Sequence, residues 1–270
     1  MFRRPQIMGV LNVTPDSFSD GGKFVGLETA VSQGRSLIED GADILDIGGE
    51  STRPGAKTVS GEEEIARVVP IIQAIRETLK DNDPEPVISI DTRKPEVAEA
   101  AILAGADIWN DVSALTYSED SLSLAADLGC PVILMHAQGS PETMQDRPSY
   151  EDPVGEILSY LRARIEACEA AGIDRHKITI DPGIGFGKRL SDNLAILRET
   201  SRFAEVAPTL IGTSRKSFIQ KIDGSPVEKR LSGSLSSALY AAQQDAAILR
   251  VHDVAETLQA LRVWEAIENE

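Results

Sequence analysis

The most constraining feature of this sequence is the regular alternation of short apolar runs with longer amphipathic stretches along nearly all of its 270 residues. Several short runs are almost wholly apolar, which is typical of parallel strands covered on both faces. Eight such alternations in this length predict a closed (β/α)8 TIM barrel with parallel strands rather than an open doubly wound sheet. The candidate strands are 7–11, 44–47, 87–90, 108–109, 132–135, 178–180, 209–211 and 247–251.

Between the candidate strands, apolar residues recur three or four positions apart, which predicts helices with one buried face. Two helix-to-strand turns share the residues Gly-Ala-Asp-Ile, at 41–44 and 105–108, and we expect the glycine to end each helix. No linker or break in composition divides the sequence, so we expect a single domain over residues 1–270. The clearest apolar faces comprise Ile65, Val68, Val69, Ile72, Ile75 and Leu79; Val154, Ile157, Leu158, Leu161, Ile165 and Cys168; and Val254, Leu258, Leu261 and Trp264.

The charge balance limits the classes of ligand. The chain has 43 acidic and 27 basic residues, a net charge of −16, which argues against a nucleic-acid partner. A small anionic substrate would be repelled by such a surface, so its site must contain a local cluster of Arg and Lys.

Cysteine content and hydropathy indicate the compartment. The two cysteines, Cys130 and Cys168, lack metal-ligand spacing and are interpreted as small core residues of a protein in a reducing compartment. No run approaches the roughly 20 apolar residues that a membrane helix needs. We therefore expect a cytoplasmic protein with no membrane partner.

Polar residues occur at or near the end of every candidate strand. A barrel enzyme places its active site at the carboxyl ends of the strands. Each polar residue alone is explained by turn formation or helix capping. Together, after such apolar runs, they predict a polar mouth above a packed core. They are Asn12, Asp46, Asp91, Asn110, His136, Asp181, Ser214, Arg250 and His252.

This ring of side chains contains both signs of charge. Asp91 and Asp181 can accept hydrogen bonds from an N–H-rich heterocycle, and Asn110 can both donate and accept beside them. Lys216 and Arg250 follow strands 7 and 8, where barrels frequently bind phosphate. Arg215, next to Lys216, is interpreted as one partner of a surface ion pair.

Three loops on the same side are unusual. The loops 12–25 and 48–61 are long for a barrel and contain glycines, so we expect them to act as lids on the active face. The segment 181–188, Asp-Pro-Gly-Ile-Gly-Phe-Gly-Lys, is similar to a phosphate-binding loop. It lacks the Ser or Thr after the lysine and the required glycine spacing, so it does not predict a nucleotide site. Its three glycines still allow backbone to approach a flat ligand.

Seven segments of the sequence contain motifs at the strand ends: 8–22, 48–55, 89–95, 110–113, 181–188, 214–217 and 250–253. The first runs from Met8 to Gly22, and the second contains Glu50-Ser51-Thr52-Arg53-Pro54-Gly55; these two are the most specific. In this order the seven segments resemble the dihydropteroate synthase family. They follow the strand ends from residue 8 to about residue 255, so the resemblance covers nearly the whole chain.

The resemblance implies a transferase of folate biosynthesis. Such an enzyme joins 4-aminobenzoate to 6-hydroxymethyl-7,8-dihydropterin diphosphate, forms 7,8-dihydropteroate and releases diphosphate with the help of Mg2+. The implied reaction is dissociative, with diphosphate leaving before the arylamine attacks, and it needs no nucleophilic side chain. We also expect a homodimer.

The resemblance also assigns roles to individual residues. It implies that the pterin is bound by Asp91, Asn110, Asp181 and Lys216. It implies that the diphosphate and its Mg2+ contact Asn12, Arg250 and His252, with Asn12 as the metal ligand. The implied aminobenzoate pocket is bordered by Thr52, Arg53, Pro54, Phe186 and Ser214. Asp20, Arg53 and Lys216 are the implied catalytic residues, and Asp20 would face the developing positive charge.

Two alternatives stay open at this point. A corrinoid-dependent pterin-binding methyltransferase would share the carboxylate and Asn110 cradle but would lack the Asn12 loop and the pair Arg250 and His252. A catalytically silent pterin-binding homologue would be expected to lose the diphosphate ligands. The sequence departs from the family's usual residues at Ala137 and Trp109, which we expect to affect packing near the pterin.

Overall fold

The computed structural model describes residues 4–13, 23–50, 58–80, 85–139 and 148–269. Its eight strands form one parallel sheet in the order β6-β5-β4-β3-β2-β1-β8-β7. A parallel bridge between Ile180 and Thr209 joins the two ends of the sheet, so the barrel is nearly closed. The strands are β1 Gln6–Asn12, β2 Ile44–Gly48, β3 Val87–Asp91, β4 Ile108–Asp111, β5 Val132–Met135, β6 Ile178–Asp181, β7 Leu210–Ile211 and β8 Ile248–Val251.

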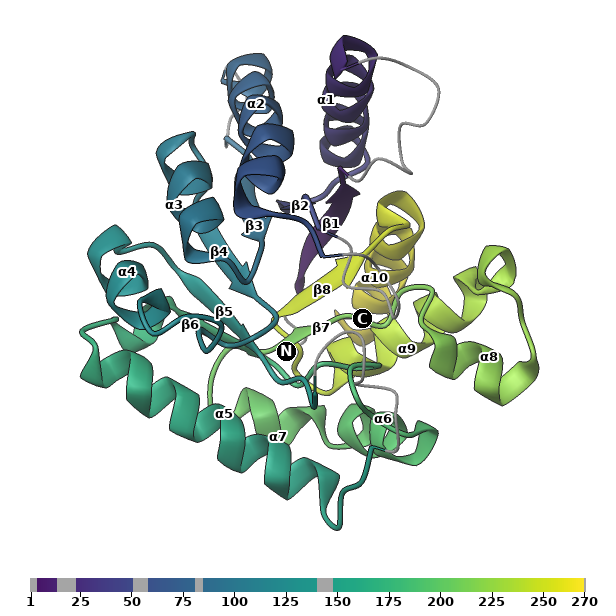
Figure 1. Cartoon of the computed structure of the whole chain (residues 1–270). Helices are drawn as coiled ribbons and strands as arrows, with labels where there is room; N and C mark the ends of the chain where they lie inside the picture. The colour runs from purple at the N-terminus through teal and green to yellow at the C-terminus, as the bar shows by residue number, and fades with distance from the viewer. Residues whose placement is uncertain (1–3, 14–22, 51–57, 81–84, 140–147, 270) are drawn as a thin grey trace.

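Helices alternate with the strands and surround them (Figure 1). This arrangement confirms the predicted (β/α)8 class, and every candidate strand lies within two residues of an observed one. The helices are α1 Lys23–Glu39, α2 Gly61–Leu79, α3 Pro95–Leu103, α4 Ser121–Leu128, α5 Pro153–Ala170, η2 Arg175–Lys177, α6 Leu190–Arg198, α7 Thr200–Ala204, α8 Ser217–Asp223, η3 Val227–Lys229, α9 Leu231–Gln243 and α10 Val254–Asn269.

The helices begin and end where local chemistry favours it. The Ser60 side chain accepts a hydrogen bond from the Glu63 amide at the start of α2, and Asp152 accepts one from the Gly155 amide at the start of α5. Gly41 and Gly105 adopt φ values of 99° and 113° after α1 and α3, as expected for the repeated turns. Each strand can therefore begin directly after its helix.

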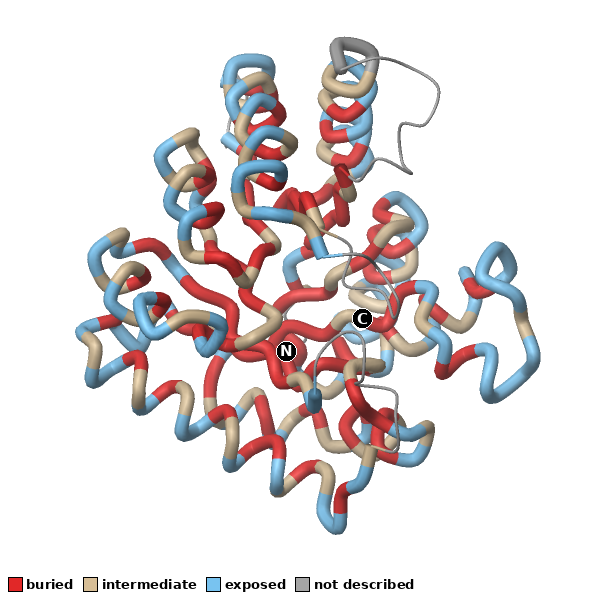
Figure 2. Tube along the Cα trace, viewed as in Figure 1, coloured by how far each residue is buried: buried red, intermediate tan, exposed pale blue. Residues whose placement is uncertain are grey.

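The apolar residues form two layers. A large cluster lies between the strands and the helices, and a smaller one, containing Met8, Ile44, Ile133, Leu210 and Ile248, lies inside the barrel. Burial is concentrated at the centre and on the inner sides of the helices (Figure 2). The buried face of α5 confirms the prediction, since its buried residues are Val154, Ile157, Leu158, Leu161, Ile165 and Cys168.

Trp109 corrects one expectation. Its ring is fully buried in the cluster between the sheet and the helices, and its indole Nε1 donates to the carbonyl of Thr92 over 2.8 Å. Neighbouring residues of a strand face opposite sides of the sheet, and Asn110 faces the barrel interior. Trp109 therefore packs away from the mouth of the barrel, whereas its bulk was expected to affect packing near the pterin.

Cys130 and Cys168 are buried free thiols, as expected for core residues. Within the described part of the chain, no helix is long and apolar enough to cross a membrane. A single domain over 1–270 stays a prediction; one sheet containing strands from Gln6 to Val251 favours it.

The loop after β4 contains two buried residues in the left-handed region. Ala114 and Leu115 have φ values of 53° and 59°, which non-glycine residues rarely adopt. The Asp111 carboxylate accepts from the Ser113 and Leu115 amides over 2.7 and 2.8 Å, and Arg164 Nε donates to the Ala114 carbonyl over 2.8 Å. These hydrogen bonds hold the turn in its strained conformation.

We expect Asp111→Ala to lower the free energy of unfolding by about 1–3 kcal/mol, because buried backbone donors lose their acceptor. Urea unfolding followed by circular dichroism measures this change. Asp120→Ala is the matched control, since Asp120 is an exposed carboxylate that caps α4 without a side-chain hydrogen bond. Equal stability of the two variants would show that Asp111 does not hold the turn.

Candidate active site

The barrel interior changes from apolar to polar along its axis. Ile44 and Ile248 belong to the inner apolar cluster, and residues two positions later on a strand face the same side. Asp46 and Arg250 therefore lie directly above them, nearer the carboxyl ends of β2 and β8. Asn110 holds the equivalent place on β4. These strand ends form the candidate active site.

Arg250 is the centre of this polar layer. Its Nε donates to Asp46 over 2.6 Å and its Nη2 donates to Asp91 over 2.8 Å. Asn110 donates to both Asp46 oxygens over 3.3 Å. Burial opposes the charge on Arg250, but Asp46 and Asp91 hold the pKa of Arg250 above its usual range. Asp46 was predicted at a strand end; it lies instead in the middle of β2 and is fully buried.

Asp91, at the end of β3, has a carboxyl whose pKa is shifted towards neutrality. Burial raises the pKa of Asp91 to about 7; the Arg250 guanidinium opposes that rise, and the carboxylates of Asp46, Glu64 and Asp111 add to it. A carboxyl with such a pKa near neutrality gains stabilisation when a ligand donates hydrogen bonds to its ionised form.

Asp181 ends β6, Lys216 follows β7, and the two charges interact electrostatically. Asp181 is buried and accepts from the Gly183 amide over 2.7 Å. Burial raises the pKa of Asp181, while the Gly183 amide and the nearby Lys216 ammonium oppose the rise. Burial and the Arg250 charge lower the pKa of Lys216 to about 8. The Lys216 ammonium also lies 4.1 Å from the centre of the Phe186 ring, a cation–π distance.

Ser214 and His252 form a neighbouring pair beyond β7 and β8. The Ser214 hydroxyl oxygen lies 3.0 Å from His252 Nδ1 and accepts from the His252 amide over 3.2 Å. Burial and the charge of Arg250 lower the pKa of His252 to about 4, so its ring is neutral at pH 7. The exposed Arg215 pairs with Asp253 over 3.1 Å, which confirms the predicted surface ion pair.

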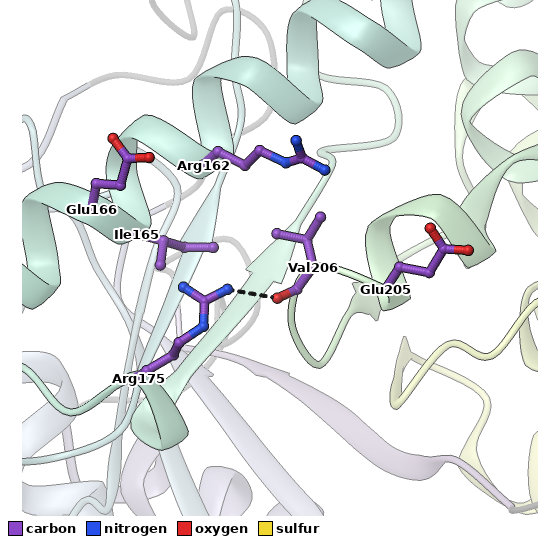
Figure 3. A pocket seen from close by; sticks show the side chains of 6 residues that line it. All are labelled: Arg162, Ile165, Glu166, Arg175, Glu205 and Val206. Atoms are coloured by element: carbon purple, nitrogen blue, oxygen red, sulfur yellow. Dashed lines mark hydrogen bonds between the residues drawn. The ribbon is translucent and has the colours of Figure 1, made fainter.

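A separate pocket of about 290 Å3 lies elsewhere on the molecule (Figure 3). In it, Arg175 Nη2 donates to the Val206 carbonyl over 2.9 Å. Its elements η2 and the α7–β7 connection precede β6 and β7, so it is at the opposite end of the barrel from the polar strand ends. The pocket is lined by Arg162, Ile165, Glu166, Arg175, Glu205 and Val206.

Comparison with known proteins shows the family to which the chain belongs. The family model described as pterin binding enzyme matches residues 8–252. The dihydropteroate synthase of Escherichia coli strain K12 is 49% identical over 263 residues, which are 97% of this chain and 91% of that protein. The chain belongs to the dihydropteroate synthase family. It is accordingly a transferase of folate biosynthesis.

Solved structures agree with this assignment. The dihydropteroate synthase of Xanthomonas albilineans with 4-aminobenzoic acid superposes with a TM-score of 0.90 at 48% identity, covering 98% of this chain and 93% of that one. The same enzyme in complex with 7,8-dihydropteroate gives a TM-score of 0.88 at 44% identity, covering 99% and 95%.

The structure brings together most of the residues that the dihydropteroate synthase resemblance selected. Asp46 joins Asn110 to Arg250, Arg250 contacts Asp91 directly, and Asp181, Lys216 and Phe186 lie beside them. Asn12 ends β1 next to Gly48 of β2. Four further selected residues, Asp20, Thr52, Arg53 and Pro54, lie outside the described residues, as do most of the two loops expected to act as lids.

Sequence reasoning missed a buried ion-pair network below the loop 48–61. Lys94 Nζ contacts Glu64 over 2.6 Å and Glu50 over 3.0 Å, and Glu50 also accepts from the Val59 amide over 2.9 Å. The network therefore joins both ends of this loop to the end of β3. Its partners lie 30 and 44 residues from Lys94, so periodicity gives no signal for it; a lysine directly before a helix-starting proline was the only hint.

The described ranges contain no group of three or more His, Cys, Asp or Glu side chains that could hold a metal ion.

We expect the Asp91 carboxyl to titrate near pH 7, well above its ordinary value of about 4. NMR of protein with 13C-labelled aspartate carboxyls measures the midpoint. Asp46→Asn removes a negative charge that raises the pKa of Asp91, so this pKa should fall in the variant. Asp127→Asn, on the exposed face of α4, should leave the pKa of Asp91 unchanged. A midpoint near the ordinary value in the unaltered protein would contradict this description of the site.

Proposed function

We propose that the chain joins 4-aminobenzoate to 6-hydroxymethyl-7,8-dihydropterin diphosphate, producing 7,8-dihydropteroate and diphosphate. One observation carries this proposal: buried hydrogen-bond acceptors and partly buried cations from different strand ends meet in one layer of the barrel. Such a layer fits a substrate that combines an N–H-rich ring with an anionic tail. The Xanthomonas albilineans complexes with 4-aminobenzoic acid and with 7,8-dihydropteroate support it.

The pterin is held by Asp91, Asn110, Asp181 and Lys216. Ionised carboxylates accept from the ring N–H groups, the Asn110 amide donates and accepts, and the Lys216 ammonium donates. Asp181 is buried and its carboxylate already accepts from the Gly183 amide, so its side chain is held in place before the ligand arrives. Binding of the pterin therefore costs little side-chain entropy at this residue. The pKa of Asp91, about 7, also favours pterin binding, because a ring with several N–H donors stabilises the ionised form of the Asp91 carboxyl.

The diphosphate lies toward Arg250, His252 and Asn12. These residues form the local cationic and polar cluster that a chain of net charge −16 needs to bind an anion. The neutral ring of His252 is oriented by Ser214, so it offers a hydrogen bond without a second buried charge.

Mg2+ fits this arrangement with Asn12 as its protein ligand. A side-chain amide oxygen at the end of β1 suits a hard cation, and the remaining ligands would come from the diphosphate and water. When bound, Mg2+ neutralises charge on the leaving diphosphate.

The reaction breaks the C–O bond between the pterin's exocyclic methylene and the diphosphate, and the electron pair leaves with the diphosphate oxygen. The aminobenzoate nitrogen then forms the new C–N bond and releases a proton. Lys216 holds the ring in place, and Asp20 on the loop 12–25 balances the positive charge that develops on it. Exclusion of water strengthens each of these electrostatic interactions.

The aminobenzoate occupies a pocket bordered by Phe186 and Ser214, together with Thr52, Arg53 and Pro54. The Phe186 ring is already fixed beneath the Lys216 ammonium, which gives the arylamine an apolar wall next to the pterin. Arg53 provides a positive charge for the carboxylate of 4-aminobenzoate.

The proposal includes a cytoplasmic homodimer. Two buried free thiols, Cys130 and Cys168, suit a reducing compartment. Ile222, Val227 and Leu231 are exposed apolar side chains on consecutive elements α8, η3 and α9, and a second subunit is the partner we expect there.

The test is release of diphosphate that requires both substrates together. Asp181→Asn removes the charged acceptor and should lower kcat/KM about tenfold or more, since a hydrogen bond to a charged group contributes roughly 1.5–3 kcal/mol. Asp174→Asn, at an exposed position before η2, should behave like the unaltered enzyme. Diphosphate release without 4-aminobenzoate, or a methyl transfer in its place, would reject the proposed reaction.

We expect Mg2+ alone to bind the free enzyme weakly, and diphosphate to make Mg2+ binding measurable by isothermal titration calorimetry. Asn12→Ala should weaken Mg2+ binding in the presence of diphosphate about tenfold, by loss of one protein oxygen. Asn269→Ala, near the exposed end of α10, is the control. Tight binding of Mg2+ without diphosphate would contradict the assignment of Asn12.

A further inference from the structure

Lys188 is a fully buried lysine whose charge the proposed reaction does not use. It follows the glycine-containing segment 182–187, and its side chain is 1% exposed. Its ammonium lies 3.0 Å from His136 Nδ1, 3.2 Å from the His136 carbonyl oxygen and 3.0 Å from the Phe186 carbonyl oxygen. None of these three partners is a carboxylate. A buried ammonium held only by neutral groups is costly, so its position needs an explanation.

The ammonium joins two segments that border the candidate active site. The His136 carbonyl belongs to the end of β5, and the Phe186 carbonyl belongs to the loop that follows Asp181. The two segments are packed very closely, because a Cβ atom on Gly183 would lie 2.0 Å from the His136 carbonyl oxygen, and one on Gly187 would lie 2.5 Å from that of Gln138. These glycines therefore let the loop approach protein backbone, rather than only a flat ligand as the sequence suggested.

The charges around Lys188 come from several elements. Burial lowers the pKa of Lys188 to about 7; Asp181 of β6 opposes this, Lys216 adds to it, and Asp192 of α6 opposes it. Burial and the Lys188 charge lower the pKa of His136 to about 3, so the ring is neutral and its Nδ1 accepts from the ammonium. The rings of Tyr150 and Tyr160 lie against His136.

Two consequences for the site follow from this position. The Lys188 ammonium lies close to Gly183, whose amide donates to Asp181, since a Cβ atom on Gly183 would be 3.3 Å from it; its charge is one of those that favour the ionised form of Asp181. The hydrogen bond to the Phe186 carbonyl fixes the backbone of the residue whose ring lies beneath Lys216. A single buried group thus supports the acceptor for the pterin and the wall of the aminobenzoate pocket.

We propose that Lys188 is a positioning residue for the reaction, one that keeps Asp181 charged and holds the loop 182–187 against the end of β5. This inference rests on the proposed function, in which Asp181 and Phe186 contact the two substrates. Lys188 itself touches neither substrate and acts through those residues.

The test measures the affinity of 6-hydroxymethyl-7,8-dihydropterin diphosphate, with Mg2+ and without 4-aminobenzoate, by calorimetry from pH 6 to pH 9. Lys188→Met keeps the length of the side chain and removes its charge; replacing a buried charge by an apolar group is often neutral for stability. We expect its affinity at pH 6 to be about tenfold weaker than that of the unaltered enzyme. Lys80→Met, which changes an exposed lysine at the end of α2, should leave the affinity unchanged.

The pH dependence separates an effect of charge from simple damage to the fold. Lys188 is protonated below a pKa of about 7 and loses its charge as the pH rises through that value. The ratio of affinities between the unaltered enzyme and Lys188→Met should therefore be largest at pH 6 and approach one by pH 9. The KM for 4-aminobenzoate should also rise in the variant, because Phe186 is less firmly held. Lys188→Gln, which keeps a hydrogen-bond donor without the charge, should show the same ratio and serves if the methionine variant does not fold.

Asp181→Asn, measured alongside, distinguishes failure of the inference from failure of the proposed function. If Asp181→Asn binds the pterin as well as the unaltered enzyme does, the proposed pterin cradle is wrong. If Asp181→Asn weakens binding while Lys188→Met does not, the cradle stands and the positioning role of Lys188 is wrong. A ratio that does not change between pH 6 and pH 9 overturns the role of its charge.

Discussion

The polar layer of this barrel depends on the guanidinium of Arg250. It lies between the carboxylates of Asp46 and Asp91, which come from two other strands, and each of these acids would be strongly disfavoured as a buried charge without it. Its planar shape allows separate N–H groups to reach both acids at once. The Asn110 amide then bonds to the carboxylate that Arg250 has neutralised. Because Arg250 joins β8 to β2 and β3, and Asn110 joins β4 to β2, the spacing of these strands at the mouth is set by hydrogen bonds as well as by apolar packing below.

The same layer explains how a strongly acidic chain can bind an anion. Most of the acidic residues in the described ranges are exposed, whereas Lys188 is fully buried and Lys216 and Arg250 are only partly exposed, so their charges are less screened by water than those of the surface acids. Burial makes Lys188 and Lys216 weaker bases, so their charges depend on the acids beside them. Acids and bases of the site are therefore mutually dependent, and a substitution at one of them changes the charge state of the others.

The fold was accessible from the sequence because parallel strands buried on both faces leave short apolar runs between amphipathic helices. The face of the sheet on which each strand residue lies could also be predicted from the sequence. Once Asn110 is assigned to the barrel interior, the alternation of side chains along a strand requires Trp109 to face the helices. The depth of Asp46 was not, since only the pairing of β2 with β1 and β3 shows that it lies below the strand end. Nor were the carboxylate partners of Lys94 or the His136 partner of Lys188, since these contacts bridge 30 to 52 residues of sequence and leave no periodic trace. Long-range polar contacts in a core are chosen by three-dimensional proximity, which a linear pattern does not contain.

The seam between β6 and β7 differs from every other junction in the ring. Strand β7 has only two residues, and a single bridge between Ile180 and Thr209 joins it to β6, whereas β1 and β2 are paired over five positions. Fewer ladder hydrogen bonds make sliding of one strand past the other easier here than elsewhere. Asp181 stands on one side of this seam and Lys216 follows the strand on the other. The junction of the barrel with the fewest backbone hydrogen bonds thus lies between an acid and a base, Asp181 at the end of β6 and Lys216 after β7.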